Sequence, residues 1–247
     1  DWRRSAGSDH LFVREREWEA AHTVWLWADL SPSMRFRGAA VLVSKRDRAL
    51  VLTLALGELL AEGGERVGFL DVLPPTASRR VVERLAVALV ARDRAAGDAD
   101  SLPPPVRIGE LSDVILVSDF LEPAEVIAAR LRSLANRGVG GHLVEVLDPA
   151  EETLPYHGRA EIIGLEGDES MIAERVEGLR AAYTTRLAAH RQAIADVARS
   201  LGWSILRHRT DRPAAEALFG LHARVSGRAG ADAAMTPRRS EPMETQP

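Results

Sequence analysis

No cysteine occurs among the 247 residues of the chain. This absence excludes a disulfide scaffold, a zinc site built on thiolates and a cysteine nucleophile. Lysine is nearly absent as well, because Lys45 is the only lysine among 32 basic residues. The preference for arginine, together with abundant alanine, is typical of a GC-rich bacterial source and requires no functional cause.

Long hydrophobic runs are also missing. The most apolar stretch, residues 49–60, is too short to span a bilayer and is bordered by charged residues, so it predicts a buried helix. The formal net charge is -4 at pH 7, and basic residues are interspersed with acidic ones. Because nucleic-acid binding needs a concentrated basic surface, this pattern argues against a nucleic-acid partner. We expect no membrane span either.

The motifs of common catalytic sites do not occur. The seven histidines are scattered and form no H-E-x-x-H pattern, and there is no G-x-S-x-G turn for a serine nucleophile. The glycine-rich residues 138–141 follow a predicted helix and precede a predicted strand, which is the reverse of the order in a phosphate-binding loop. These glycines are better explained as the end of a helix.

What the sequence does contain is enough apolar material for one α/β domain. With 46% hydrophobic and 28% charged residues, it can bury a substantial core without disulfides or a structural metal. Residues 23–28 and 113–117 are apolar on both faces, as strands of a parallel sheet covered by helices are. The predicted strands cover residues 23–28, 67–72, 113–117, 141–147, 158–165 and 203–206, and the predicted helices cover residues 44–62, 79–94, 123–136, 169–201 and 213–225.

Strands that alternate with helices predict right-handed crossovers and a mostly parallel sheet with helices on both faces. We expect the more polar residues 158–165 at an edge of this sheet and the proline-rich residues 74–78 in a loop. The domain is predicted to cover residues 23–225. Residues 1–22 form a segment before it, and residues 226–247, which are poor in large apolar side chains, form a disordered tail.

The most informative motif is the run Asp29-Leu30-Ser31-Pro32-Ser33, directly after the strand at residues 23–28. A carboxylate and two hydroxyls at alternate positions supply the hard oxygen ligands that magnesium prefers, with water completing the octahedron. One open position would accept a carboxylate of another molecule. The alternative interpretation is that these residues cap the helical segment that follows, since helix starts favour Ser and Asp.

Two further oxygen-bearing positions follow predicted strands, Thr76 in the proline-rich loop and Asp119. The carboxyl ends of parallel strands meet at one edge of a sheet, where the sites of open α/β folds gather. We therefore expect Asp29, Thr76 and Asp119 to lie together at this edge. The sequence predicts a Mg²⁺ site there, with Mn²⁺ or Ca²⁺ as alternative ions.

An acidic cluster follows the strand at residues 141–147 and contains Asp148, Glu151 and Glu152. Paired carboxylates can perform acid and base chemistry or bind metal. We favour the simpler interpretation, in which Asp148 and the proline after it initiate a turn and the glutamates are exposed.

Several sequence blocks are similar to known families. A strand followed by D-x-S-x-S resembles the metal-ion-dependent adhesion site of von Willebrand factor type A domains. The chain also resembles the bacterial domain-of-unknown-function family 58, from residue 1 to about residue 225. The blocks that carry this second resemblance are residues 1–6, 11–15, 25–34 and 148–151.

The resemblance implies a von Willebrand A-like fold. It also implies a partnership with AAA+ ATPases of the MoxR type, beside which family members are typically encoded, in the assembly or maturation of other proteins. By the adhesion-site pattern, Ser31 and Ser33 would ligate the ion directly, and Asp29 directly or through water. Thr76, or Ser78 in its place, would match the second-loop threonine, and Asp119 the third-loop aspartate.

Three functional hypotheses follow. The leading one is a non-enzymatic protein-interaction module that binds Mg²⁺ through Asp29, Ser31 and Ser33 and docks an acidic side chain of a partner. The second is a metal-dependent hydrolase in which Glu151 or Glu152 serves as the base. The third is a structural scaffold without bound metal. We expect a cytoplasmic bacterial protein whose chain continues upstream of its first residue, where a membrane anchor could lie.

Overall fold

The computed structural model describes residues 22–95, 100–135, 138–164 and 170–235. Six strands form one sheet in the order β3-β2-β1-β4-β5-β8, and all neighbours are parallel except β2 and β3. The α/β class and the mostly parallel sheet are confirmed, and the strand order is consistent with a von Willebrand A-like fold. The strands are β1 (Thr23–Ala28), β2 (Arg66–Phe69), β3 (Leu73–Thr76), β4 (Ser112–Ser118), β5 (Gly140–Leu147) and β8 (Ser204–Arg209).

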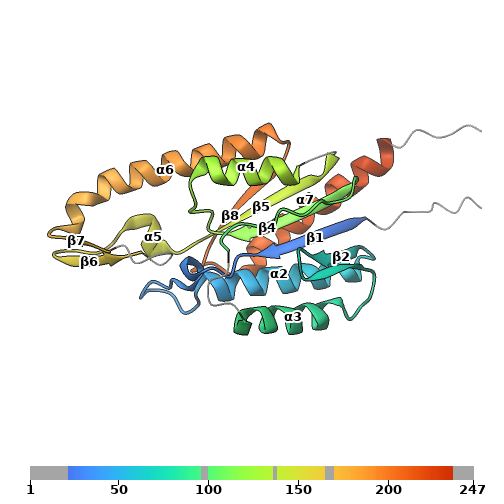
Figure 1. The fold of residues 1–247 in the computed structure, drawn as a ribbon, viewed down its shortest axis with the longest axis horizontal. Coiled ribbons are helices and arrows are strands. Elements are labelled where there is room, and N and C mark those ends of the chain that lie inside the picture. The colour runs from blue at the N-terminus through green and yellow to red at the C-terminus, as the bar shows by residue number, and fades with distance from the viewer. Residues whose placement is uncertain (1–21, 96–99, 136–137, 165–169, 236–247) are drawn as a thin grey trace, which may run out of the picture.

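Helices cover both faces of the sheet (Figure 1). On one face lie α2 (Lys45–Glu62), α3 (Val81–Ala95) and α7 (Ala214–Met235), and on the other lie α4 (Ala124–Leu134) and α6 (Val176–Ser200). Each face has its own buried apolar cluster, one containing Leu26 of β1 and the other Leu116 of β4. Burial on both faces explains why these strands are continuous apolar runs. Within the described segments, none of the helices has the length and apolar character needed to traverse a bilayer.

The bounds of α2 follow from its caps. The Ser44 hydroxyl accepts a hydrogen bond from the backbone N–H of Asp47 (3.0 Å), which is an N-cap, and the chain turns after Glu62 at Gly63 and Gly64. Gly64 has φ +89°, a left-handed conformation that glycine adopts at low cost. These caps confirm the predicted helix at residues 44–62 and make Lys45 its first residue.

Residues 74–76 of the proline-rich stretch expected in a loop belong to strand β3 instead. Proline has no N–H to donate, so it is tolerated where a strand has a neighbour on only one side. β3 is such an edge strand, because its one neighbour in the sheet is β2. The two strands run antiparallel, with Leu73 opposite Phe69 and Thr76 opposite Val67.

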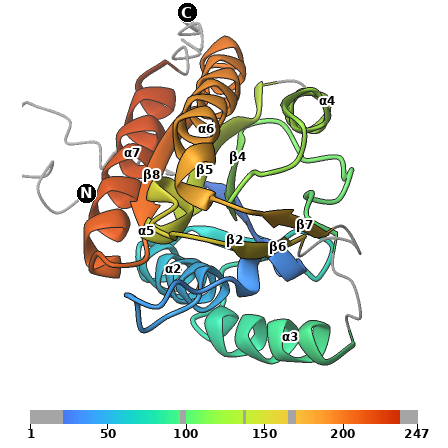
Figure 2. The same ribbon diagram turned by 90° about the vertical axis from the view of Figure 1, so that its left-hand side faces the viewer.

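The strand expected at residues 158–165 does not join the main sheet. Residues Ala160–Ile163 form β6, which pairs antiparallel with β7 (Ser170–Ala173), so the helix predicted from residue 169 begins only at Val176. We call this two-stranded sheet the β6–β7 ribbon. Figures 1 and 2 show it beyond the carboxyl ends of the main strands, beside the short helix α5 (Pro149–Thr153).

The structure also extends the end of the domain. Helix α7 continues to Met235, whereas the sequence predicts a disordered tail from residue 226. The rest of that predicted tail, residues 236–247, lies outside the described residues, as do residues 1–21 of the predicted N-terminal segment.

Candidate functional site

Asp29 lies directly after β1 and is completely buried. Its backbone N–H donates to the carbonyl of Val117 (2.9 Å), which extends the pairing of β1 with β4 by one residue. Oδ1 accepts the N–H of Ser31 (2.8 Å), and Oδ2 accepts the hydroxyl of Ser118 (2.7 Å). Both carboxylate oxygens of Asp29 are therefore bonded within the protein.

The hydroxyls of Ser31 and Ser33 lie side by side, with their Oγ atoms 3.2 Å apart. Both residues are buried, and Ser31 directly precedes the short 3-10 helix η1 (Pro32–Arg35). The Ser31 side chain makes no capping bond to η1. Ser31 therefore occupies the N-cap position, as the alternative interpretation expects, but its hydroxyl does not make the expected capping bond.

The cation in this region is Lys45, whose side chain has no exposure to solvent. Its Nζ lies 2.7 Å from Oδ2 of Asp119, which directly follows β4, and 2.5 Å from Oε1 of Glu151 in α5. The centroid of the Phe36 ring is 5.8 Å from Nζ, within the range of a cation–π contact. We call Lys45, Asp119 and Glu151 the Lys45 cluster. It connects the start of α2, the end of β4 and α5.

Three carboxyl groups and one ammonium share this buried region. Burial, and next the charge of Asp119, raise the pKa of Asp29 from 3.8 to about 7. Burial also raises the pKa of Glu151, against the opposing effect of Lys45. Burial alone would lower the pKa of Lys45, but the charges of Asp119 and Glu151 outweigh it and raise this pKa. Lys45 therefore carries its positive charge at neutral pH.

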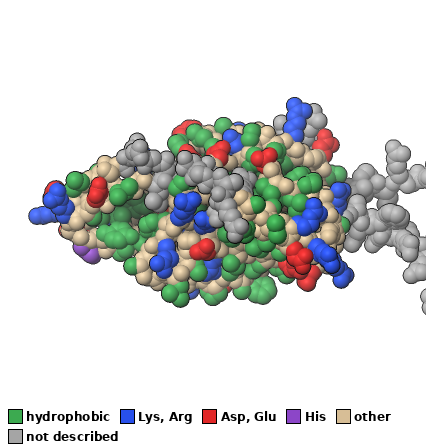
Figure 3. Space-filling view, turned by 60° about the horizontal axis from the view of Figure 1, so that its bottom comes forward, with side chains coloured by type: hydrophobic (Ala, Val, Ile, Leu, Met, Phe, Trp, Pro, Cys, Tyr) green, Lys and Arg blue, Asp and Glu red, His purple; other side chains and the backbone are tan. Residues whose placement is uncertain are grey.

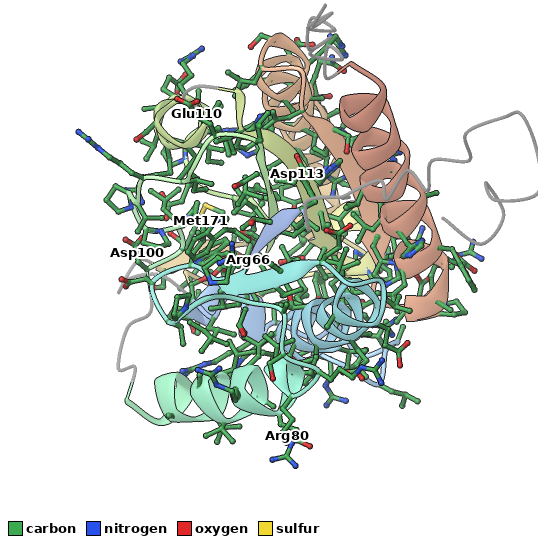
Figure 4. All side chains as sticks on the ribbon, turned by 90° about the vertical axis from the view of Figure 1, so that its right-hand side faces the viewer. Arg66, Arg80, Asp100, Glu110, Asp113 and Met171 are labelled. Atoms are coloured by element: carbon green, nitrogen blue, oxygen red, sulfur yellow. The ribbon has the colours of Figure 1, made fainter. Side chains whose placement is uncertain are left out.

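Thr76 does not reach this edge of the sheet. It is opposite Val67, which pairs with Val24 near the start of β1. Asp29 is five residues farther along β1, which is about 16 Å at about 3.3 Å per residue. Figure 4 views the end of the sheet to which Thr76 belongs, with Arg66 of β2 labelled next to the Val67 position. The expectation that Thr76 joins Asp29 is therefore wrong.

Ser78, the alternative to Thr76, does not supply the expected second-loop ligand either. Ser78 follows Thr76 by two residues, and its N–H donates to the Thr76 hydroxyl (3.3 Å). The Ser78 hydroxyl in turn accepts the N–H of Arg80 (3.2 Å). Both hydroxyls thus belong to the turn that leads from β3 into α3.

Asp148 and Glu151 begin helix α5. The Asp148 carboxylate accepts the N–H of Ala150 (2.8 Å), and Glu151 accepts the N–H of Asp148 (3.3 Å), which together form a capping box. Asp148 also accepts the N–H of Gly38 (2.9 Å) and so holds the loop between η1 and α2 against α5. Asp148 is thus structural, as the simpler interpretation predicts. The expectation that the glutamates are exposed is wrong for Glu151, whose side chain is 18% exposed and binds Lys45.

A family model described as "Protein of unknown function DUF58" matches residues 1–193. The chain belongs to the DUF58 family. An uncharacterized protein of Mycobacterium bovis and two uncharacterized proteins of Mycobacterium tuberculosis are each 30% identical to it over 236 residues. These matches cover 86% of this chain and 70% of each relative.

Two solved structures are similar to this DUF58 chain. The conserved hypothetical protein BatB from Bacteroides thetaiotaomicron has a TM-score of 0.45 and 15% identity, and the match covers 85% of this chain and 100% of BatB. An aerotolerance-related membrane protein from Bacteroides fragilis has a TM-score of 0.48 and 14% identity, with coverage of 84% and 100%.

The described residues of this DUF58 chain do not fit the expected magnesium ion well. The Asp29 motif and Asp119 do converge, but Thr76 lies elsewhere and Asp119 already binds Lys45. A divalent ion on Asp119 would lie beside the ammonium, and the two positive charges would repel each other. In the part of the chain that the structure describes, no group of three His, Asp or Glu side chains is arranged to hold a metal ion.

Sequence reasoning missed Lys45 and Ser118. No local pattern pairs Lys45 with Asp119 or Glu151, which are 74 and 106 residues away along the chain. The one signal that could have found Lys45 is its rarity, because this chain uses arginine for every other basic residue. Ser118 had a weaker signal, since it directly precedes Asp119 at a predicted strand end.

Proposed function

We propose that this chain is a non-enzymatic protein-interaction module. Its docking surface is the carboxyl end of the sheet together with the β6–β7 ribbon, and its partner is a MoxR-type AAA+ ATPase with which it acts in the assembly or maturation of other proteins. The resemblance of the sequence supports the choice of partner. The observation that carries the proposal is the apolar surface of the ribbon.

Both faces of the ribbon present apolar side chains to solvent. Ile162 and Met171 are paired across the two strands and share one face. Ile163 and Ile172 lie on the other face, and they are 63% and 57% exposed. Figure 3 shows hydrophobic side chains gathered on this projecting end of the molecule. An isolated two-stranded sheet is marginally stable in water, and a contiguous exposed apolar patch is typical of an interaction site.

The burial and the ion pairs of the ionisable groups at the carboxyl end of the sheet support a binding role over catalysis. Asp29 and Lys45 have no solvent exposure, and Asp119 is 3% exposed. The two glutamates that the hydrolase hypothesis needs are engaged in ion pairs, Glu151 with Lys45 and Glu152 with arginines of α6 and β8. A general base must reach a substrate or its attacking water, and these side chains are bonded to protein cations instead.

Binding of the purified chain to a purified MoxR-type ATPase tests the proposal. Replacing both Ile163 and Ile172 by Glu puts charges on the apolar face, and we expect at least about a tenfold loss of affinity. The matched control is Val87→Glu, at a residue that is 71% exposed on α3, a helix that Figures 1 and 2 show away from the ribbon. This control should bind like the wild type.

The same experiment can contradict the proposal. If the double variant keeps the melting temperature of the wild type and also its affinity, the ribbon is not the docking surface. If the wild-type chain binds no MoxR-type ATPase at all, the choice of partner is wrong.

A further inference from the structure

The Lys45 ammonium occupies the position where the expected ion would meet Asp119. It contacts carboxylate oxygens from two elements, at 2.7 Å on Asp119 and 2.5 Å on Glu151. The second oxygen of Asp119 accepts the N–H of Leu121 (3.3 Å). Both oxygens of the carboxylate expected to ligate the ion from the third loop are thus already bonded.

The chemistry of the bonded groups is that of a cation site. An ammonium is a compact, strongly hydrated point charge with three donors, and it can bind several carboxylates that converge from different directions. Burying the carboxylates of Asp119 and Glu151 side by side without a positive charge between them would be strongly unfavourable. Lys45 provides this charge, and its bonds join the start of α2 to the end of β4 and to α5 without an exchangeable ion.

Composition points to the same residue independently. The chain uses arginine at every basic position except this one. Among the residues that the structure describes, Lys45 is also the only buried Lys or Arg. The one lysine of the chain is therefore also the one buried Lys or Arg among the described residues.

We propose that Lys45 supplies, as part of the chain, the positive charge that a divalent cation supplies in the adhesion site that the sequence resembles. The site at the carboxyl ends of the strands is then independent of metal ions. This inference concerns the isolated chain and does not depend on the partner named above. If the proposed function also holds, partner binding is insensitive to chelation.

Melting temperatures of the full chain in EDTA and in millimolar Mg²⁺ or Mn²⁺ test the proposal. We expect the wild type to melt at the same temperature in all three solutions. Lys45→Met removes the charge at similar side-chain length, so it should melt several degrees lower in EDTA and recover part of that loss with Mg²⁺ or Mn²⁺. The matched control, Arg80→Met, removes an exposed charge at the other end of the sheet and should show neither effect.

Three results would overturn the proposal. One is a wild type that Mg²⁺ stabilises and whose response disappears in Ser31→Ala, because the ion would then bind beside Lys45. Another is a Lys45→Met chain as stable as the wild type in EDTA. The third is a destabilised Lys45→Met chain that neither ion rescues, because the lysine would then not stand in for an ion.

A second measurement covers the case in which Lys45→Met does not fold. Because the chain has one lysine, a ¹⁵N-lysine sample of the wild type gives a single side-chain ammonium signal. We expect this signal to be sharp through slow proton exchange and unchanged by Mn²⁺. Paramagnetic broadening of this signal at low Mn²⁺ would place an ion at the cluster and overturn the proposal.

Discussion

His208 should make the stability of the protein depend on pH between about 4 and 6.5. The residue lies in β8 and is buried, and its Nε2 is 3.3 Å from Nη1 of Arg48. Arg48 is held there by the carbonyls of Thr210 (3.1 Å) and Arg212 (2.7 Å). Burial, and next the charge of Arg48, lower the pKa of His208 from 6.5 to about 4, against a smaller opposing effect of Asp211.

The direction of this pH dependence follows from how many protons the folded and unfolded chains bind. Between pH 4 and 6.5 the unfolded chain protonates His208 and the folded chain does not, so the free energy of unfolding rises with pH in this window. The contribution is complete above pH 6.5 and is lost as the pH falls to about 4. A pKa lowered from 6.5 to about 4 corresponds to about 3 kcal/mol.

The assay compares wild type with His208→Gln in urea unfolding at several pH values. Glutamine keeps an acceptor for Arg48 and does not titrate. Asp29, with its pKa raised to about 7, works in the opposite direction, since its folded form is destabilised as the pH rises from 4 to 7. Both chains contain Asp29, so its effect cancels in the difference between them. A difference in unfolding free energy that stays constant from pH 4 to 7 would refute the reasoning.

Three further substitutions probe the packing by urea or thermal unfolding. In Gly141→Ala, the new Cβ would overlap the ring of Trp203, and we expect a loss of at least about 2 kcal/mol, so an unchanged melting temperature would contradict the packing. Gly57 lies in α2, and in Gly57→Ala the new Cβ would be 3.4 to 3.7 Å from side chains of β1 and α3, which are ordinary contact distances. We expect the free energy of unfolding to rise by about 1 kcal/mol, whereas a loss would show that the space is too tight. Glu145→Gln weakens bonds at 2.9 and 2.8 Å to arginines of α6 and β8 whose side chains are 13% and 47% exposed. It should cost about 1 to 3 kcal/mol, and an unchanged free energy of unfolding would show that these bonds are not formed.

The central sheet could be predicted because its strands are buried on both faces. Residues 23–28, 113–117 and 141–147 become β1, β4 and β5, and the neighbouring strands and covering helices bury β4 and β5 along their whole length. The two errors concern strands with a neighbour on one side only. Strand pairing decides whether Pro74 and Pro75 form an edge strand, and whether residues 160–163 join the main sheet or form a ribbon. Local periodicity in the sequence does not encode this pairing.

The site likewise contains residues that the sequence could place and residues that it could not. Asp29, Asp119 and Glu151 could be placed because each lies just past a strand that the sequence reveals, and parallel strands bring their carboxyl ends to one edge. Thr76 could not be placed, because the direction of β3 depends on its antiparallel pairing. Lys45 differs from both cases. A bias towards arginine explains why lysine is rare, but it acts on all basic positions alike and does not explain why the one lysine is buried between two carboxylates. A planar guanidinium would need both carboxylates to move, whereas an ammonium fits between them. A residue that departs from a compositional bias therefore identifies a constrained position, even where no motif surrounds it.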